Sequence, residues 1–507
     1  MNRIAFILGL MVIGLSSLAQ PYTLDLTFQP AFNIRNNTLD IGPTNDLWEN
    51  PQSGTIYIVG GFKIPYPGQQ HGGISSMLRD GSRNLNFSFN GGSSTGISHI
   101  FKRPGSELVT SSNNGYYVRR DTTGSVHPSF NQWAANFINT AKCSEAYVPY
   151  FFDDGSYLIS KDFLPNGCQI INPPDTFPHR YIVKVTPQGL WDSSFVKDAT
   201  GEPTHFVPYD SNRMMVYGSP SVFTHYDGVP IHGMCRIYLD GTLDTTFQSP
   251  LGTFSGNTYN VVHIDTSGSI FLGGIYGYFN LRSKPNSNFT LIKLNPDGSL
   301  DNNFANFQGP TQGPNVLGST SFINAISPTE DGGYLVGGFF DNYQGFSKHN
   351  LAKIDSNGHI EPQYFNTHGP DSASMPGITS DSMGFVRQIK KSAFGGYYVM
   401  GNFFTWDGAP VQGIVRIKDM TVGEESPKLK AESLKLYPNP TENQITLSSA
   451  LPIEEFEIFD LVGKKVKQVQ LQNTYQYILN LQRLDNGLYF VKVKVGEVWV
   501  TKKVVKQ

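Results

Sequence analysis

The fold is decided by a phrase that the chain repeats, and its clearest copy reads GSIFLGG at residues 268–274 and LIKLNPDGSLDNNF at residues 291–304. A second copy reads GYLVGGF at 333–339 and LAKIDSNG at 351–358. Apolar runs of this length, separated by Asp-Gly, Asn-Gly or Ser-Gly turns, predict short antiparallel strands. Further openings of the phrase occur at 54–62 and 396–403.

The end of each copy can be followed through a closing phrase, Leu-Asp-x-x-Phe or a decayed form of it. The closing phenylalanines are expected at Phe28, Phe89, Phe130, Phe195, Phe247, Phe304 and Phe365. They are 41 to 65 residues apart, a period typical of β-propellers and solenoids. Each period has room for about four short strands, which is the content of one propeller blade.

The two ends of the repeat region complement each other. LDLTF at 24–28 is a closing phrase with no opening before it, whereas the unit that opens at Gly396 has IVRI at 414–417 and no closing phrase. We expect the N-terminal strand to complete the last blade, because a closed ring leaves no sheet edge unpaired. Seven openings and seven closing phrases predict seven blades, and the short second unit, about 105–130, leaves six or eight open.

These units resemble delta-60 repeats, which occur in secreted bacterial proteins and are expected to form β-propellers. The resemblance is clearest over 268–304 and 333–365 and weakest over 131–179. It implies an all-β body, here residues 20–420, and no particular reaction.

Residues 434–507 form a separate module with recurring aromatic, glycine and lysine motifs. They read LYPNP at 436–440, EIFDLVGKKV at 457–466, NGLYFVKV at 486–493 and KKVVK at 502–506. In this order and spacing they resemble the type A C-terminal sorting domain of the type IX secretion system of the Bacteroidota. The residues that carry the resemblance are Tyr437, Pro438, Asn439, Pro440, Gly463, Gly487, Tyr489, Lys503 and Lys506.

The resemblance implies a compact β-sandwich that the outer-membrane translocon recognises. It also implies that the module is commonly cut off and that the body is then attached to surface lipopolysaccharide. An ordinary appended β-sandwich used for binding is the alternative. Residues 421–433 are polar and contain a proline, which predicts a flexible linker between body and module.

The first residues of the chain agree with export. Arg3 precedes an apolar run from Ile4 to Leu15, and Ser17-Leu18-Ala19 is a small-x-small site. This pattern predicts a signal peptide over 1–19, cut between Ala19 and Gln20. The run is too short to span a bilayer core of about 30 Å. No other stretch is apolar enough, so no transmembrane segment is expected in the mature chain.

Composition argues for β-structure and against one class of partner. Of 507 residues, 16% are charged and 13% aromatic, with 52 Gly and 32 Pro, which suits strands joined by tight turns. The net charge is −3, and the Lys and Arg residues form no basic stripe. Nucleic acid is therefore not expected as a partner, because phosphate binding requires clustered basic residues.

The cysteines and histidines do not point to a metal. Cys143 and Cys168 lie in neighbouring irregular segments, and a disulfide between them, which export would permit, is left open. Cys235 occupies a position that Ala352 and Val415 fill in other units, which predicts a small buried side chain. The eleven His residues lack metal-ligand spacing, so we expect no zinc site.

No catalytic signature stands out. His-Glu-x-x-His and Walker-type loops are absent, and residues 297–303 lack the alternating ligands of a calcium loop. The motif FTHYDGVP at 223–230 looks catalytic in isolation, but it returns at 404–410 and more loosely at 340–345. We interpret it as a turn whose aromatic side chain is packed and whose Asp accepts bonds from local backbone N–H groups. No catalytic, cofactor or metal residue is therefore predicted.

A binding site is expected where the repeat is interrupted. The insertions at 163–179 and 309–315 are the candidates, because insertions in repeat folds map to loops that often lie on the binding face. Tolerated loop variation is the alternative.

The sequence thus predicts an all-β protein, a β-propeller of about seven blades followed by a small C-terminal β-sandwich. We expect it to pass through the periplasm and the translocon, and to be secreted or attached to the outer cell surface. The leading hypothesis for the body is a non-enzymatic adhesion module that binds glycan or protein. A surface hydrolase or lyase acting on polysaccharide, with carboxylates gathered from distant blades, and a structural surface-layer spacer are the alternatives.

Overall fold

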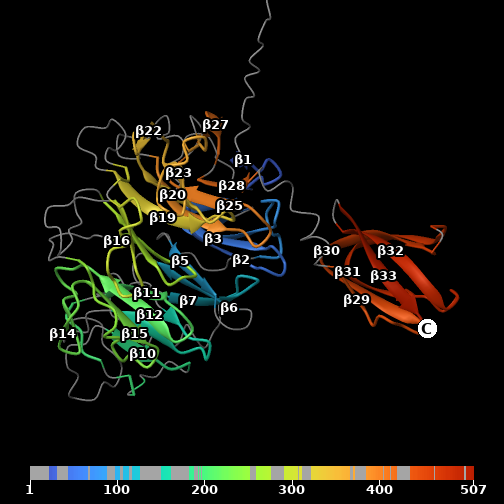
Figure 1. Ribbon diagram of the computed structural model, residues 1–507, viewed down its shortest axis with the longest axis horizontal. Coiled ribbons are helices and arrows are strands. Elements are labelled where there is room, and N and C mark those ends of the chain that lie inside the picture. Colours follow the sequence, from blue (N-terminus) through green and yellow to red (C-terminus); the bar gives the residue numbers. More distant parts are fainter. Residues whose placement is uncertain are drawn as a thin grey trace, which may run out of the picture.

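The structure is a computed structural model in which every regular element of the described residues is a β-strand (Figure 1). It describes residues 22–30, 44–66, 69–87, 97–102, 107–112, 117–125, 150–160, 182–187, 192, 194–195, 197–201, 203–251, 259–275, 290–306, 308–310, 321–365, 369–370, 384–403, 405–411, 413–419, 434–461, 463–495 and 498–507. The predicted signal peptide and linker lie outside these residues. In the described ranges, no helix is long and apolar enough to cross a membrane.

The part of the chain described before residue 420 contains seven antiparallel sheets of three or four strands. Sheet 1 is β2 (Thr44–Glu49), β3 (Ile56–Tyr66) and β4 (Gln69–Met77); sheet 2 is β5 (Ile97–Lys102), β6 (Glu107–Ser112) and β7 (Tyr117–Asp121); sheet 3 is β8 (Tyr150–Phe151), β9 (Tyr157–Ser160) and β10 (Ile182–Val185); sheet 4 is β11 (Pro203–Pro208), β12 (Arg213–Gly218) and β15 (Met234–Tyr238); sheet 5 is β16 (Tyr259–Ile264), β17 (Ile270–Gly274) and β18 (Leu291–Leu294); sheet 6 is β19 (Phe322–Pro328), β20 (Tyr334–Phe339) and β23 (Leu351–Ile354); sheet 7 is β24 (Val386–Lys391), β25 (Tyr397–Gly401), β28 (Ile414–Asp419) and β1 (Tyr22–Leu24).

Successive sheets pack against one another around a ring. The first strands contact each other between sheets 1 and 2, 5 and 6, 6 and 7, and 7 and 1, so they lie nearest the ring axis. Sheets 2 and 3 meet through the Phe101 and Phe151 rings, 5.8 Å apart. Sheets 3 and 4 touch through β9 and β11, and sheets 4 and 5 share a core that contains Met215 and Leu272. Figure 1 accordingly shows the blue first sheet beside the orange last one.

The N-terminal strand closes this ring, as the sequence predicted. β1 pairs antiparallel with β28, with Tyr22 opposite Asp419 and Leu24 opposite Ile417. The last sheet is thereby completed by the first described residues of the chain. The all-β propeller fold is confirmed.

The closing phrase finishes the outer edge of a sheet through a repeated pair of contacts. The Asp301 N–H donates to the Lys293 carbonyl at 2.9 Å, and the two side chains form an ion pair at 3.6 Å. The same two contacts join Lys184 to Asp192, Arg236 to Asp244, Lys353 to Glu361 and, across the ring closure, Arg416 to Asp25. This geometry explains why a basic residue and an acidic residue recur together in the sequence.

Two of the predicted closing phenylalanines were wrong. In each described closing phrase the aromatic N–H donates to the carbonyl of the residue three positions earlier, as from Phe304 to Asp301. By this contact the closing residues are Phe87 rather than Phe89, and Tyr364 rather than Phe365. The phrase has decayed in both units, so its sequence no longer marks the structural position. The contact confirms Phe28, Phe195 and Phe247, while Phe89 and Phe130 lie outside the described residues.

The closing aromatic residue also explains the glycine of the Asp-Gly and Asn-Gly turns. Gly358 has φ 84°, and a Cβ there would lie 2.6 Å from the Phe304 ring of the preceding sheet. A Cβ at Gly241 would likewise lie 2.6 Å from the Phe195 ring. The turn glycine therefore lets one sheet seat its closing aromatic residue against the next.

We expect Gly358→Ala to destabilise the protein more than Gly345→Ala. Both glycines have φ 84°, so both alanines incur the left-handed backbone cost of about 1–2 kcal/mol. Only at Gly358 would the methyl group overlap a ring, because nothing lies within 4 Å of a Cβ at Gly345. Such overpacking adds about 1–3 kcal/mol. Denaturant unfolding of both variants measures the difference, and equal losses would contradict the contact between sheets.

The C-terminal module is a sandwich made by two long, bent strands. It contains β29 (Lys435–Tyr437), β30 (Gln444–Phe459), β31 (Lys465–Asn480), β32 (Gly487–Val495) and β33 (Val498–Lys506). Residues 444–448 of β30 pair with β29 and with 476–480 of β31, whereas 453–459 pair with 465–474 and with β32. The register shifts between these halves, so one sheet folds into two layers.

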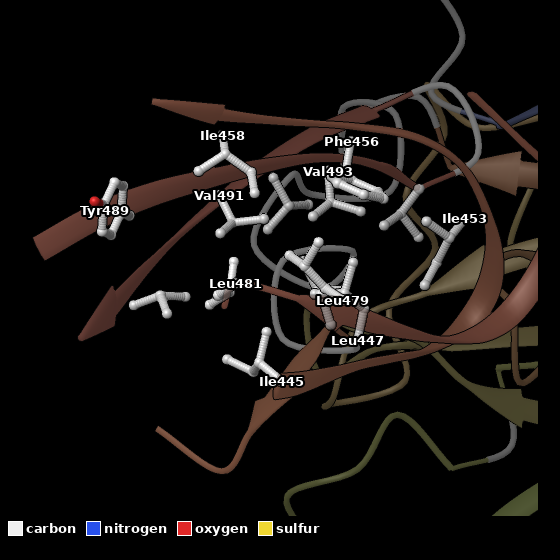
Figure 2. Packing of buried hydrophobic residues seen from close by; sticks show 14 residues of the cluster. Ile445, Leu447, Ile453, Phe456, Ile458, Leu479, Leu481, Tyr489, Val491 and Val493 are labelled. Atoms are coloured by element: carbon white, nitrogen blue, oxygen red, sulfur yellow. The ribbon is translucent and has the colours of Figure 1, made fainter. Parts of the chain in front are cut away.

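The two layers enclose one apolar core (Figure 2). Ile445, Leu447 and Leu479 of one layer face Ile458 and Val491 of the other, and all five are fully buried. The buried members of this core all come from residues 434–504. The predicted small β-sandwich is therefore confirmed.

Candidate functional site

The motifs of the C-terminal module meet at one end of it. The Asn439 side chain donates to the Lys503 carbonyl at 2.7 Å and accepts from the Val505 N–H at 2.9 Å. Gly487 pairs with Lys506, whose ammonium donates to the Asn486 side chain at 2.9 Å. The first and last motifs, 64 residues apart, thus form one structural unit.

The central motif belongs to the same end. Gly463, with φ 81°, closes the turn between β30 and β31 and donates to the Asp460 carbonyl. The Tyr489 hydroxyl donates to the Asp485 carbonyl at 2.9 Å. Burial raises the pKa of Tyr489, and the nearby Asp485 and Asp460 carboxylates raise it further. Tyr489 and the Gly463 turn are therefore neighbours.

Several motif residues at this end are exposed rather than buried. We call them the motif end: Tyr437, Pro438, Asn439, Pro440, Gly463, Gly487 and Lys503. Tyr437 is 48% exposed, although buried aromatic residues dominate domain cores. Lys506 and Tyr489 are buried behind this surface and support it.

The repeated Asp-Gly motif is structural, with one correction. It forms the hairpins β13 (His225–Tyr226) with β14 (Val229–Pro230), β21 (Asn342–Tyr343) with β22 (Phe346–Ser347), and β26 (Thr405–Trp406) with β27 (Ala409–Pro410). Tyr226 and Trp406 are buried, as predicted. Asp227, however, accepts from the distant Asp198 N–H rather than from a local one, and Asp407 accepts from the distant Gly369 N–H. The segment between successive sheets docks on each of these two hairpins and supplies that donor.

Several predicted positions cannot be placed. Ala19, Gln20, Cys143, Cys168 and the insertion 163–179 lie outside the described residues. Of the insertion 309–315 only the first two residues are described; the Pro310 carbonyl accepts from Thr290 and Ser321. Cys235 is buried opposite Val216, as predicted, and burial raises the pKa of its thiol. Within the described ranges, no three metal-ligating side chains lie together.

The inner strands carry a set of polar residues that sequence reasoning missed. In six sheets the first strand has a register shift at the same level, beside the end of the second strand. The residues after the shift are Asp46, His99, His205, Val261, Ala325 and Gln388. The extra, bulged residues are Asn45, Ser98, Thr204, Asn260, Asn324 and Arg387. We call these twelve residues the axial ring.

The side chains of the axial ring differ from sheet to sheet, whereas the backbone that carries them repeats. The six residues after the register shift provide a carboxylate, two imidazoles, an amide and two apolar side chains, although the backbone around them is alike in all six sheets. Bulges re-aim side chains and are common next to functional sites. An alignment of the copies on their second strands would have revealed the variation, because polar residues then stand where Val261 and Ala325 stand in other copies.

Asp46 links three sheets at the axis. It accepts from the Lys390 ammonium at 2.5 Å and from the Ile100 N–H at 3.1 Å, and it lies 3.8 Å from His99 Nδ1. Burial lowers the pKa of His99; Asp46 opposes this shift, and Lys390 and Arg387 add to it. These charged groups are therefore close enough to act on one another.

Arg387 and Gln388 are neighbours on β24 with unsatisfied polar atoms. In the described part of the chain, Arg387 Nε and Gln388 Oε1 are buried and have no hydrogen-bond partner. Burial lowers the pKa of the Arg387 guanidinium, whose carbon lies 5.4 Å from the centre of the Phe385 ring. Because buried polar atoms are nearly always paired in native proteins, this donor and this acceptor mark the axial ring as a candidate binding site.

We expect His205 to make stability depend on pH. Its ring stacks on Tyr217 at 4.8 Å, and burial, with a contribution from His99, lowers the pKa of His205 from 6.5 to about 4. Between these values the unfolded chain binds a proton that the folded chain does not, so the free energy of unfolding falls as pH falls. His205→Phe should remove this part of the slope. Denaturant unfolding between about pH 7 and 4 measures it.

The exposed His359 provides the control for this experiment. His359→Phe also removes one histidine and should leave the pH slope nearly unchanged. A His205→Phe slope equal to that of the wild type would contradict the assignment.

Two family models match the chain. The one for the secretion system C-terminal sorting domain matches residues 435–507. The one for a domain of unknown function (DUF5122) beta-propeller matches residues 266–304, which include the clearest repeat. No curated protein matches the chain.

Solved structures with similar folds come from several organisms. PorZ, a surface component of the type-IX secretion system of Porphyromonas gingivalis, is 14% identical with a TM-score of 0.37, over 93% of this chain and 61% of that one. The extracellular domain of the two-component system BT4673 from B. thetaiotaomicron is 11% identical with a TM-score of 0.40, over 93% and 57%. YCF48 from Cyanidioschyzon merolae is 11% identical with a TM-score of 0.36, over 76% and 98%.

This chain spans about three fifths of the length of the first two structures. Its own sheets, ring closure and C-terminal sandwich agree with the two family models. The chain is therefore a β-propeller protein that ends in a type IX secretion system C-terminal sorting domain.

Proposed function

We propose that the propeller is a binding module at the outer cell surface and that its ligand binds at the axial ring. The observation that carries this proposal is the adjacent, unpartnered donor and acceptor of Arg387 and Gln388. They lie at a level where the side chains differ from sheet to sheet while the backbone repeats. Both side chains are half-buried, so a ligand can contact them and supply hydrogen-bond partners that the described protein groups do not.

Export to that surface is assigned to the sorting domain, and the translocon is proposed to contact the motif end. The proposed contact with the translocon is supported by the exposed motif residues, which come from distant parts of the sequence and lie together at one end of the module. A buried core from the module's own residues holds them in place.

The binding proposal can be tested by presenting the full chain with a panel of glycans and matrix proteins. Asn260→Trp would place a bulky ring at the exposed Asn260 position of the axial ring. Asn302→Trp, at an exposed position of the outer closing phrase, is the matched control. We expect saturable binding that Asn260→Trp abolishes and Asn302→Trp retains.

Other results would overturn the proposal in distinct ways. Saturable binding that survives Asn260→Trp would put the site elsewhere. The absence of any saturable ligand would favour the structural spacer. Turnover of the bound glycan would favour the hydrolase or lyase.

A further inference from the structure

The axial ring carries one positive charge that no described group balances. Lys390, a second basic residue close to the ring, forms an ion pair with Asp46. Arg387 has no acidic partner among the described residues, although it is half-buried. Because a buried charge without a partner is strongly unfavourable, this guanidinium is suited to an anionic ligand, and its planar fork matches a carboxylate.

The amide side chains next to Arg387 are suited to hydroxyl groups of the ligand beside its carboxylate. Gln388 Oε1 is an acceptor without a donor. The Asn324 amide donates to the Val386 carbonyl at 3.5 Å, which puts a further amide next to Arg387, and Asn260 is exposed at the same level. Amide side chains both donate and accept, so they suit a ligand with several hydroxyl groups.

An aromatic surface adjoins the guanidinium. The rings of Phe385 and Phe322 are 5.5 Å apart, and both are half-buried. Binding sites combine such apolar contact area with a few placed polar groups. The C–H face of a sugar ring would pack on this surface while its carboxylate meets Arg387.

The inner strands are poorly suited to an extended peptide. Peptides commonly bind by adding a strand to a free sheet edge. Here the inner strands of six sheets are bulged, and a bulge blunts a sheet edge against such pairing.

Resting on the proposed binding function, we infer that the axial ligand is an acidic glycan. Arg387 binds the carboxylate of a uronic acid residue, Gln388 accepts a hydrogen bond from a hydroxyl group of the same sugar, and Phe385 packs against its ring.

The test measures binding of the full chain to oligomers of galacturonate, glucuronate and mannuronate, to their methyl esters, and to an acidic peptide. We expect at least one uronate to bind and its ester to bind much more weakly. Arg387→Gln should weaken uronate binding roughly 10- to 100-fold, because it removes a charge-assisted hydrogen bond. Gln388→Leu should weaken it about 3- to 10-fold through one neutral hydrogen bond.

The neighbouring exposed residues Arg483 and Gln482 of the sorting domain provide matched controls. Arg483→Gln and Gln482→Leu repeat the two changes and should leave affinity unchanged. Arg387→Lys, which keeps the charge but loses the fork, should be intermediate. Thermal melting establishes that each variant is folded, and Arg387→Lys replaces Arg387→Gln if the latter does not fold.

Three outcomes would overturn the inference. Equal binding of a uronate and its ester would exclude the carboxylate, and unchanged affinity in Arg387→Gln would exclude Arg387. Binding of the acidic peptide alone would exclude a glycan. These three outcomes refute the acidic glycan but leave binding at the axial ring intact. By contrast, ligand binding that Asn260→Trp does not change refutes the proposed function.

Discussion

Expression of the chain without residues 434–507 is expected to leave a folded propeller in the periplasm instead of at the cell surface. The module's core contains residues of that segment alone, so its removal takes no buried side chain from the ring. What is lost is the sorting domain and the motif end proposed to contact the translocon. Cell fractionation and protease treatment of intact cells measure the change, which should approach complete loss of surface protein.

Point variants separate the fold of the sorting domain from its surface. Phe456→Asp puts a charge in the module core, where Phe456 is fully buried, and should abolish export. Tyr475→Asp changes a 55% exposed aromatic residue on β31 and should permit export. Asn439→Ala removes the side chain that joins the first and last motifs and should reduce it. Normal surface display of the truncated chain would refute the assignment.

Asp25→Leu is expected to destabilise the propeller by about 3–5 kcal/mol, because it leaves the buried Arg416 guanidinium without its partner. The two side chains are 2% and 5% exposed. Although burial raises the pKa of Asp25, the Thr27 hydroxyl and Arg416 lower it below its usual value, as expected for a carboxylate that stays ionised. Denaturant unfolding measures the loss.

Asp244→Leu is the matched control, since Asp244 makes the same buried ion pair with Arg236 within one sheet. Both variants should lose similar free energy. Only Asp25→Leu should release β1 from β28, because β1 reaches the rest of its sheet from the other end of the chain. Limited proteolysis should then cut near the N-terminus in Asp25→Leu alone.

Two further variants bear on ring closure. Asp25→Leu combined with Arg416→Met should regain much of the loss, since an apolar pair leaves no buried charge. Deletion of residues 22–28 should lower the melting temperature by several degrees, since each kcal/mol shifts it by about 2–4 °C in a domain of roughly 150–250 residues and by less in a larger one. An unchanged melting curve would contradict closure by β1.

Sequence alone determined the features that depend on neighbours along the chain. Strand-length apolar runs, Asp-Gly turns and closing phrases are local patterns, so they revealed the propeller, and the unmatched phrase at 24–28 revealed its closure. The sorting motifs were found in the same way. Where a local pattern had decayed, as before Phe87 and Tyr364, sequence placed the closing residue wrongly.

Tertiary structure alone decided which distant side chains meet. The Asp46–Lys390 pair joins residues 344 apart, and Asn439 meets Lys503 across 64 residues. The donors to Asp227 and Asp407 come from other segments for the same reason. A repeat encodes each sheet separately, whereas the axial ring exists only after the sheets have packed around a common axis. Its chemistry therefore emerges from six scattered bulges that no local pattern connects.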